Sequence, residues 1–166
     1  GVGSRGVYFN ANSNLNNLIN NSVKAVSYSL SIINSKNNLV YNNIFNSTGT
    51  SIVTITNNAN YPNTLNVTKT LTTNIIGGNY IGGNYWINSL STGFSQKCPD
   101  SNLDGICDTN YTINNYNKDY LALTIVDNVA PSATILSPEN NSFVNGRVDL
   151  IANASDNRVV SLVYFQ

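Results

Sequence analysis

The chain has 166 residues, of which only 10% are charged, whereas Asn alone makes up about a fifth. Apolar content of 41% and ten Tyr exclude a disordered chain. The formal net charge is zero and the basic residues are thinly spread, which excludes a nucleic-acid-binding surface.

An internal repeat of about 22 residues runs through the first part of the chain. The pattern Asn-Ser-x-x-Asn-x-x-x-Asn-Asn occurs at 12–21 and again at 34–43. A third rung is expected at 51–58, with a longer loop after it at 61–63. Short β-rich runs too short for helices lie around the amides: 7–9, 18–19, 29–33, 39–41 and 44–45. Such a coil, with Asn at its bends, is typical of one rung of a parallel β-helix, in which stacked Asn side chains bond rung to rung.

The repeat ends in paired glycines followed by large aromatic residues. Because a stack of coils must cover its open end, we expect Tyr80, Tyr85 and Trp86 to form an end cap. The alternative interpretation is an aromatic platform on which sugars stack. Residues 1–88 are therefore assigned to β-helix rungs and this aromatic cap.

All eight acidic residues follow position 98, and three of them lie within 100–108. Oxygen ligands at relative positions one, three, five and nine, with Gly at six, follow the pattern of a calcium loop. The predicted ligands are the side chains of Asp100, Asn102, Asp104 and Asp108 and the backbone carbonyl of Ile106.

This loop departs from the EF-hand pattern at its twelfth position, where Tyr111 replaces the bidentate Glu. Asp119, Asp127 or water would have to complete the shell. The alternative interpretation is a cluster of Asp, Asn and Gly turns without a metal. We expect calcium in a structural role.

The two cysteines, Cys98 and Cys107, bracket the acidic loop. Two thiols without His cannot form a closed zinc site from this chain alone, so a disulfide is favoured over free buried thiols. A disulfide requires an oxidising compartment, which predicts an extracellular location. Residues 89–128 are assigned to this disulfide-bracketed extension.

From Asp127 onward, runs at 133–138, 146–156 and 159–165 predict three strands separated by polar turns. This is how a β-sandwich begins. Three strands are fewer than such a domain needs, so we expect residues 129–166 to be an incomplete sandwich.

The stretch from Gly82-Gly83-Asn84-Tyr85-Trp86 through the cysteine loop to Asp119-Tyr120-Leu121-Ala122-Leu123 resembles the end of right-handed parallel β-helix modules in archaeal cell-surface and S-layer-like proteins. Those modules are related to the periplasmic copper-maturation family of β-helix proteins, and the resemblance covers roughly 4–125. The tail, with Asn145-Gly146 among its turns, resembles the first half of immunoglobulin-like surface domains. The resemblance implies an all-β fold: a β-helix (solenoid) end with a calcium-loop cap, followed by a partial immunoglobulin-like β-sandwich.

A copper role does not follow from this resemblance. Copper prefers imidazole, thioether or thiolate ligands, whereas the chain has no His and no Met, and its two Cys are expected to pair.

Three functions compete. The first is a structural segment of a surface protein, such as an S-layer, sheath or appendage subunit, whose partners are copies of itself or other surface subunits. The second is a non-catalytic module that binds cell-surface glycans. The third, a polysaccharide lyase or hydrolase, is disfavoured because such chemistry needs paired carboxylates and residues 1–97 contain no Asp or Glu. We therefore expect no catalytic residues.

The chain has no apolar run of membrane-spanning length and opens with no signal peptide, so we expect part of a longer secreted protein. Six sequons are candidate glycosylation sites: Asn20, Asn46, Asn66, Asn110, Asn140 and Asn153. Their number alone proves nothing in a chain so rich in Asn, Ser and Thr.

Overall fold

A computed structural model describes residues 4–56, 61–127, 130–156, 160 and 162–165. The described chain is nearly all β, with a single four-residue helix, and divides into two compact units, residues 1–126 and 127–166. None of the described helices is long and apolar enough to cross a membrane.

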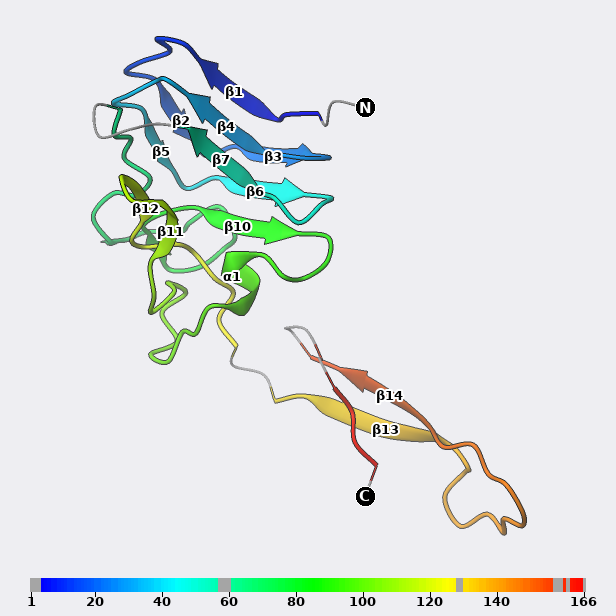
Figure 1. The fold of residues 1–166 in the computed structure, drawn as a ribbon. Coiled ribbons are helices and arrows are strands. Elements are labelled where there is room, and N and C mark those ends of the chain that lie inside the picture. Colours follow the sequence, from blue (N-terminus) through cyan, green and yellow to red (C-terminus); the bar gives the residue numbers. More distant parts are fainter. Residues whose placement is uncertain (1–3, 57–60, 128–129, 157–159, 161, 166) are drawn as a thin grey trace. The chain divides into compact units, whose positions relative to one another are not determined.

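Three short parallel sheets build most of the first unit (Figure 1). The first has the order β1 (Val7–Asn10), β4 (Leu30–Ile33) and β7 (Val53–Thr56). The second pairs β2 (Asn17–Ile19) with β5 (Leu39–Tyr41), and the third has the order β3 (Ser22–Ala25), β6 (Ile44–Ser47) and β10 (Tyr85–Asn88). Because Asn17 pairs with Leu39 and Ser22 with Ile44, successive turns of chain stack on one another with the 22-residue spacing of the sequence repeat.

The bends between these strands recur with the same spacing. Positive φ angles occur at Asn12 and Asn34, at Leu15 and Asn37, and at Asn20 and Asn42. Asn adopts left-handed backbone geometry more readily than other residues with a Cβ, so the sequence supplies it at five of these six positions. Thr56 ends β7, and residues 57 and 58 of the expected third repeat lie outside the described residues.

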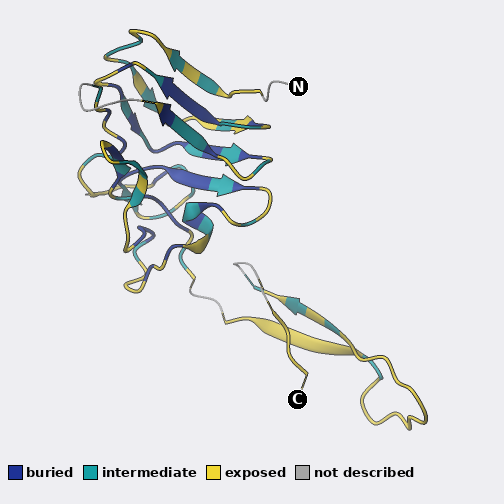
Figure 2. Cartoon of the chain, viewed as in Figure 1, coloured by how far each residue is buried: buried dark blue, intermediate teal, exposed yellow. Residues whose placement is uncertain are grey.

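Apolar columns fill the interior of the stack. In the third sheet, Val23, Phe45 and Trp86 occupy equivalent positions on successive strands, and the Phe45 and Trp86 rings stack with centroids 4.7 Å apart. Phe45 and Trp86 are fully buried, as are Leu30 and Ile32 of the first sheet (Figure 2). Full burial of such side chains contributes about 1.5–3 kcal/mol each, so these columns are a principal source of stability.

The later part of the first unit packs against this stack. An antiparallel pair, β8 (Thr70–Leu71) and β9 (Tyr80–Ile81), belongs to an insertion whose apolar residues pack around Tyr85 and Leu123 in a second core cluster. The helix α1 (Phe94–Lys97) and the antiparallel pair β11 (Tyr111–Asn114) and β12 (Asn117–Asp119) follow β10. Tyr111 stacks on Phe94 with centroids 4.7 Å apart and contacts Trp86, which extends the aromatic column past the last parallel strand.

The second unit contains one described antiparallel pair, β13 (Ser132–Ser137) and β14 (Ile151–Ser155). A third strand is expected at 159–165, but the described residues 160 and 162–165 are not in a strand. Most apolar side chains of the described part of this unit are exposed, including Ile135, Leu136 and Phe143. Figure 2 shows β13 almost wholly in the colour of exposed residues.

Candidate functional site: the ends of two asparagine ladders and the acidic loop

Two ladders of amide side chains run through the first unit. In the first, the backbone N–H and Nδ2 of Asn16 donate to Oδ1 of Asn38, Asn38 donates in the same way to Asn63, and Asn63 to Asn117. In the second, Asn21 donates to Asn43 and Asn43 to Asn84. Every bond in both ladders points the same way, toward the carboxyl end of the stack.

The second ladder ends in a carboxylate. Oδ2 of Asp119 accepts the backbone N–H of Asn84 at 2.8 Å, its Nδ2 at 3.3 Å and the indole Nε1–H of Trp86 at 2.8 Å. Oδ1 accepts the N–H of Leu121 at 3.2 Å. A carboxylate has acceptors only, so Asp119 accepts hydrogen bonds from these four N–H groups and donates none to a further coil.

Asp119 is fully buried, which sets its protonation. Burial raises the pKa of Asp119 from its ordinary value of 3.8 to about 6, because removal from water outweighs the opposing effect of the N–H donors from Asn84, Trp86 and Leu121. Burial likewise raises the pKa of Tyr111, which lies beside Trp86.

The paired glycines make room for this carboxylate. A Cβ at Gly83 would lie 1.8 Å from Oδ1 of Asp119, and a Cβ at Gly82 would lie 2.8 Å from Cβ of Leu121. Both contacts are shorter than van der Waals separation. The glycines therefore allow the segment around Asp119 to approach the last turn of the stack.

The acidic loop folds as a set of turns closed by its own side chains. Oδ1 and Oδ2 of Asp100 accept the N–H groups of Asp104 and Gly105 at 3.0 and 2.9 Å. Oδ1 of Asn102 also accepts from Asp104 N–H, at 3.2 Å, and Oδ1 of Asp104 accepts from Ile106 N–H at 2.9 Å. The side chains of Asp100, Asn102 and Asp104 thus each accept backbone N–H groups, as in Asx turns.

The other predicted ligands also have protein partners. Oδ2 of Asp104 forms an ion pair with Nζ of Lys69, which also lies over the Tyr80 ring. Oδ2 of Asp108 accepts from the N–H and hydroxyl of Ser101, and these bonds lower the pKa of Asp108. Ile106 is buried and forms a β-bridge with Leu123. Asp127 is exposed, and Asp119 serves the ladder instead.

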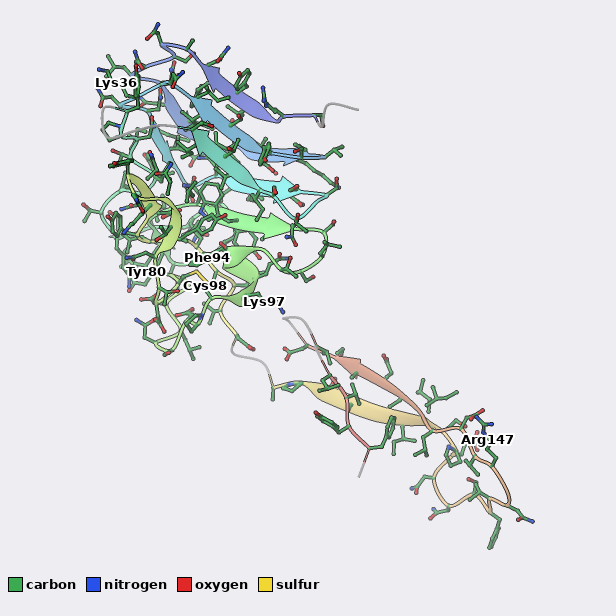
Figure 3. The ribbon with its side chains drawn as sticks, viewed as in Figure 1. Lys36, Tyr80, Phe94, Lys97, Cys98 and Arg147 are labelled. Atoms are coloured by element: carbon green, nitrogen blue, oxygen red, sulfur yellow. A yellow bond between two sulfur atoms is a disulfide. The ribbon has the colours of Figure 1, made fainter. Side chains whose placement is uncertain are left out.

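The predicted disulfide between Cys98 and Cys107 is present. Both cysteines are buried and belong to the main core cluster. Cys98 lies beside α1 and Phe94 (Figure 3). Closing this loop anchors the acidic turns to the core rather than leaving them on a free surface loop.

Two of the three predicted cap aromatics are inaccessible to a sugar. Trp86 is fully buried and Tyr85 is 8% exposed, while Tyr80 is half-buried beneath Lys69. The platform interpretation is therefore wrong for Tyr85 and Trp86. Among the sequons, Asn20, Asn110, Asn140 and Asn153 are exposed, whereas Asn46 and Asn66 are half-buried.

Comparison with known families gives two matches. Residues 2–91 match the family model of NosD, described as a periplasmic copper-binding protein, and residues 131–166 match that of a bacterial Ig domain. No curated protein and no solved structure matches the chain. The two families support a β-helix followed by an immunoglobulin-like domain, in a periplasmic or extracellular location.

These findings correct the calcium prediction, which is wrong. The matched family binds copper, and among the described residues no group of three or more His, Cys, Asp or Glu side chains is placed to hold a metal ion. The physical reason is that the ammonium group of Lys69 already neutralises Asp104, and that the turn hydrogen bonds of Asp100, Asn102 and Asp104 account for the Asp and Asn spacing without a cation. The hydrogen bonds of the loop are those of a cluster of Asp, Asn and Gly turns.

Copper itself does not fit the residues of this chain. The chain has no His and no Met, and both of its cysteines are in the disulfide. The remaining donors are oxygens and amides, which copper does not prefer. The family's metal is therefore not assigned to any residue here.

Sequence reasoning missed two functional positions, Lys69 and the ladder role of Asp119. Lys69 is a lone charge far from the acidic loop in sequence, and no local pattern pairs them. Asp119 had a detectable signal, because Gly83-Asn84 and Asp119 belong to the stretch quoted for the β-helix resemblance.

Proposed function

This chain belongs to the NosD family of periplasmic copper-binding proteins, and on that premise we propose that it serves as a structural segment of a surface or periplasmic protein rather than as a metal carrier. The segment is a right-handed β-helix solenoid that ends at the Asp119 closure and continues into an immunoglobulin-like spacer. We further propose that the parent protein is an S-layer, sheath or appendage subunit and that its partners include other surface subunits. The low charge and the disulfide support an extracellular setting.

The observation that carries this proposal is the use of the polar side chains. Buried Asn residues bond coil to coil, and Asp119, Asp100 and Asp104 bond to backbone N–H groups or Lys69. Groups committed in this way hold the fold together. They are not poised for proton transfer or for binding a substrate.

We also propose that the segment is not an enzyme. Glycoside hydrolysis uses two carboxyl groups flanking a bond, whereas the coils before Lys97 carry no Asp or Glu. We expect no release of sugar ends from plant, algal or bacterial polysaccharides. Release that disappears when a residue within 1–97 is mutated would contradict this.

Location and access in the native protein test the structural role. Antibodies raised against residues 1–126, the first compact unit, should label intact cells, or cells of which only the outer envelope is opened. Isothermal titration calorimetry with copper should show no saturable binding to the chain. A His-containing peptide that binds copper is the positive control. Antibody labelling that appears only after the cytoplasmic membrane is ruptured, or stoichiometric copper binding, would refute the proposal.

One observation favours a second candidate, glycan binding or adhesion without catalysis. A shallow groove of about 350 Å³ is lined by Tyr41, Val67, Ile81 and three threonines, Thr68, Thr70 and Thr72. An aromatic ring beside several hydroxyls, with no charged side chain in the lining, suits a neutral sugar. Tyr41→Ala would abolish NMR shift changes on titration with neutral oligosaccharides if this function holds.

A further inference from the structure

The connection between β13 and β14, residues 138–150, contains the pair Asn145-Gly146 (Figure 1). It is the only Asn-Gly pair in a sequence in which every other Asn precedes a residue with a side chain. The amide carbon of Asn and the peptide nitrogen of the next residue can close a five-membered ring. Gly favours this closure, because it has no Cβ to hinder the nitrogen and leaves the backbone free to rotate.

The surroundings of Asn145 leave both reacting groups free. All residues from 141 to 150 are exposed, and a Cβ built at Gly146 would meet no atom within 4 Å. Within the part of the chain that the structure describes, no hydrogen bond holds the Asn145 side chain or the Gly146 N–H. Further strands beside β13 or β14 would pair along the strand edges, so a connection at the end of the sheet would stay exposed.

Asp104-Gly105 is the corresponding pair in the first unit, and there the fold holds the same groups apart. The N–H of the buried Gly105 donates to Oδ2 of Asp100 at 2.9 Å. Oδ1 of Asp104 accepts from Ile106 N–H at 2.9 Å, and its Oδ2 is paired with Lys69. Ring closure at Asp104 would have to break all of these contacts.

Other asparagines are protected in a similar way. Asn42 is followed by Asn43, whose N–H donates along the second ladder to the next amide oxygen at 3.2 Å. In the second unit, Asn141 is followed by Ser142, whose N–H donates to the carbonyl of Glu139 at 3.1 Å. A peptide nitrogen held by its own hydrogen bond is a poorer nucleophile toward the preceding side chain. The bonds that build the fold therefore also keep these asparagines intact.

We propose that Asn145 is a site of spontaneous deamidation and the first asparagine of the chain to react. The Gly146 nitrogen loses its proton and bonds to Cγ of Asn145, the Cγ–Nδ2 bond breaks, and Nδ2 leaves as ammonia. Water then opens the resulting succinimide at one of its two carbonyls, which yields Asp or isoaspartate. Water is the only co-reactant, and no atom is oxidised or reduced.

The product differs from the original chain in charge and in backbone length. The new carboxylate changes the formal net charge of the chain from zero to −1 and lies two residues from Arg147, which Figure 3 labels. Isoaspartate also adds one methylene to the backbone of the connection. This inference rests on the second unit alone and holds whether or not the proposed function is correct.

The test follows the full chain during several weeks at about 37 °C, at pH 7 and pH 8, in water enriched in oxygen-18. Peptide mapping by mass spectrometry locates each incorporated oxygen, and an isoaspartate methyltransferase measures isoaspartate. The variants are Asn145→Gln, which enlarges the ring that must form, and Gly146→Ala, which keeps the amide but hinders the nitrogen. Both changes lie on an exposed connection, outside the first unit.

We expect position 145 to gain about 3 Da in labelled water, at least about tenfold faster than any other Asn. The rate should rise about tenfold from pH 7 to pH 8, because the deprotonated fraction of the nitrogen rises by that factor. Gly146→Ala should slow the reaction at least about tenfold, and Asn145→Gln should abolish it. Label that appears first at another Asn, an unchanged rate in Gly146→Ala, or isoaspartate forming as fast at Asp104 would overturn the proposal. So would an unlabelled position 145 under conditions in which a synthetic peptide of residues 139–151 reacts.

Discussion

At the scale of the residue, the most informative side chain is Asp119. An Asn at this position would offer an NH₂ group where Asn84, Trp86 and Leu121 all supply N–H donors. A carboxyl group avoids that conflict but must be buried, and burial raises its pKa to about 6. The ladder is thus closed by the one acid in the chain that is fully buried among the described residues.

The raised pKa gives stability a defined pH dependence. Between the unfolded value of 3.8 and the folded value of about 6 the folded state binds more protons, so the free energy of unfolding falls as pH rises through this window. The fall attributable to Asp119 is about 3 kcal/mol, at about 1.4 kcal/mol for each pKa unit.

Urea unfolding from pH 4 to 7, for the wild type and Asp119→Asn, measures this effect. The difference in unfolding free energy between the two proteins should shrink or reverse as pH rises, and parallel curves would contradict the assignment. Asp108 contributes with the opposite sign because its pKa is lowered, but it is present in both proteins.

At the scale of the element, the 22-residue spacing predicts the strands, their parallel order and the stacked amides, because each follows from one period. The acidic loop could not be read in the same way. Its spacing fits both a metal loop and a run of Asx turns, and the cation that pairs with Asp104 is Lys69, from a distant part of the chain. Local sequence carries no information about such a distant partner.

The ladders make a position-dependent prediction. Asn43 is fully buried, accepts from Asn21 and donates to Asn84, Tyr41 and Leu18. Asn43→Ala should lower the free energy of unfolding by about 3 kcal/mol, because several buried groups lose their partners.

The matched control is Asn21→Ala, in the same ladder at its exposed end. This change should cost about 1 kcal/mol, since water can replace the lost partner. Denaturant unfolding compares the two variants. Equal losses would mean that the ladder does not derive its stability from burial.

The disulfide makes a second prediction at this scale. Cys98 and Cys107 are nine residues apart, and both are in the core cluster. Replacing both by Ser should lower the free energy of unfolding by about 2–3 kcal/mol, through greater freedom of the unfolded chain. The single variants should lose at least as much, since each also leaves a free thiol in the core. Unchanged melting of the double variant would show that the turns close the loop without the bridge.

At the scale of the whole molecule, the two units differ in how they bury apolar surface. The first unit holds two core clusters, whereas all the buried core side chains among the described residues lie outside the second unit. The sequence predicted this difference, a stack of β-coils in the first part of the chain and an incomplete β-sandwich in the second. It predicted a third strand at 159–165 from β-branched content, but a strand also needs a neighbour to pair with, and composition does not supply one.

The last prediction follows from this contrast. Ile135, Leu136, Leu150 and Ile151 are each more than half exposed, and in the described part of this unit β13 and β14 pair only with each other. An isolated two-stranded pair is marginal in water, and exposed apolar residues on edge strands favour aggregation. Residues 127–166 expressed alone should therefore be unfolded or aggregated, with poorly dispersed NMR signals, while residues 1–126 should melt cooperatively near the temperature of the full chain. A sharp, monomeric and dispersed spectrum from 127–166 would mean that its exposed apolar side chains form a core of their own, and the second unit would then be a self-sufficient domain.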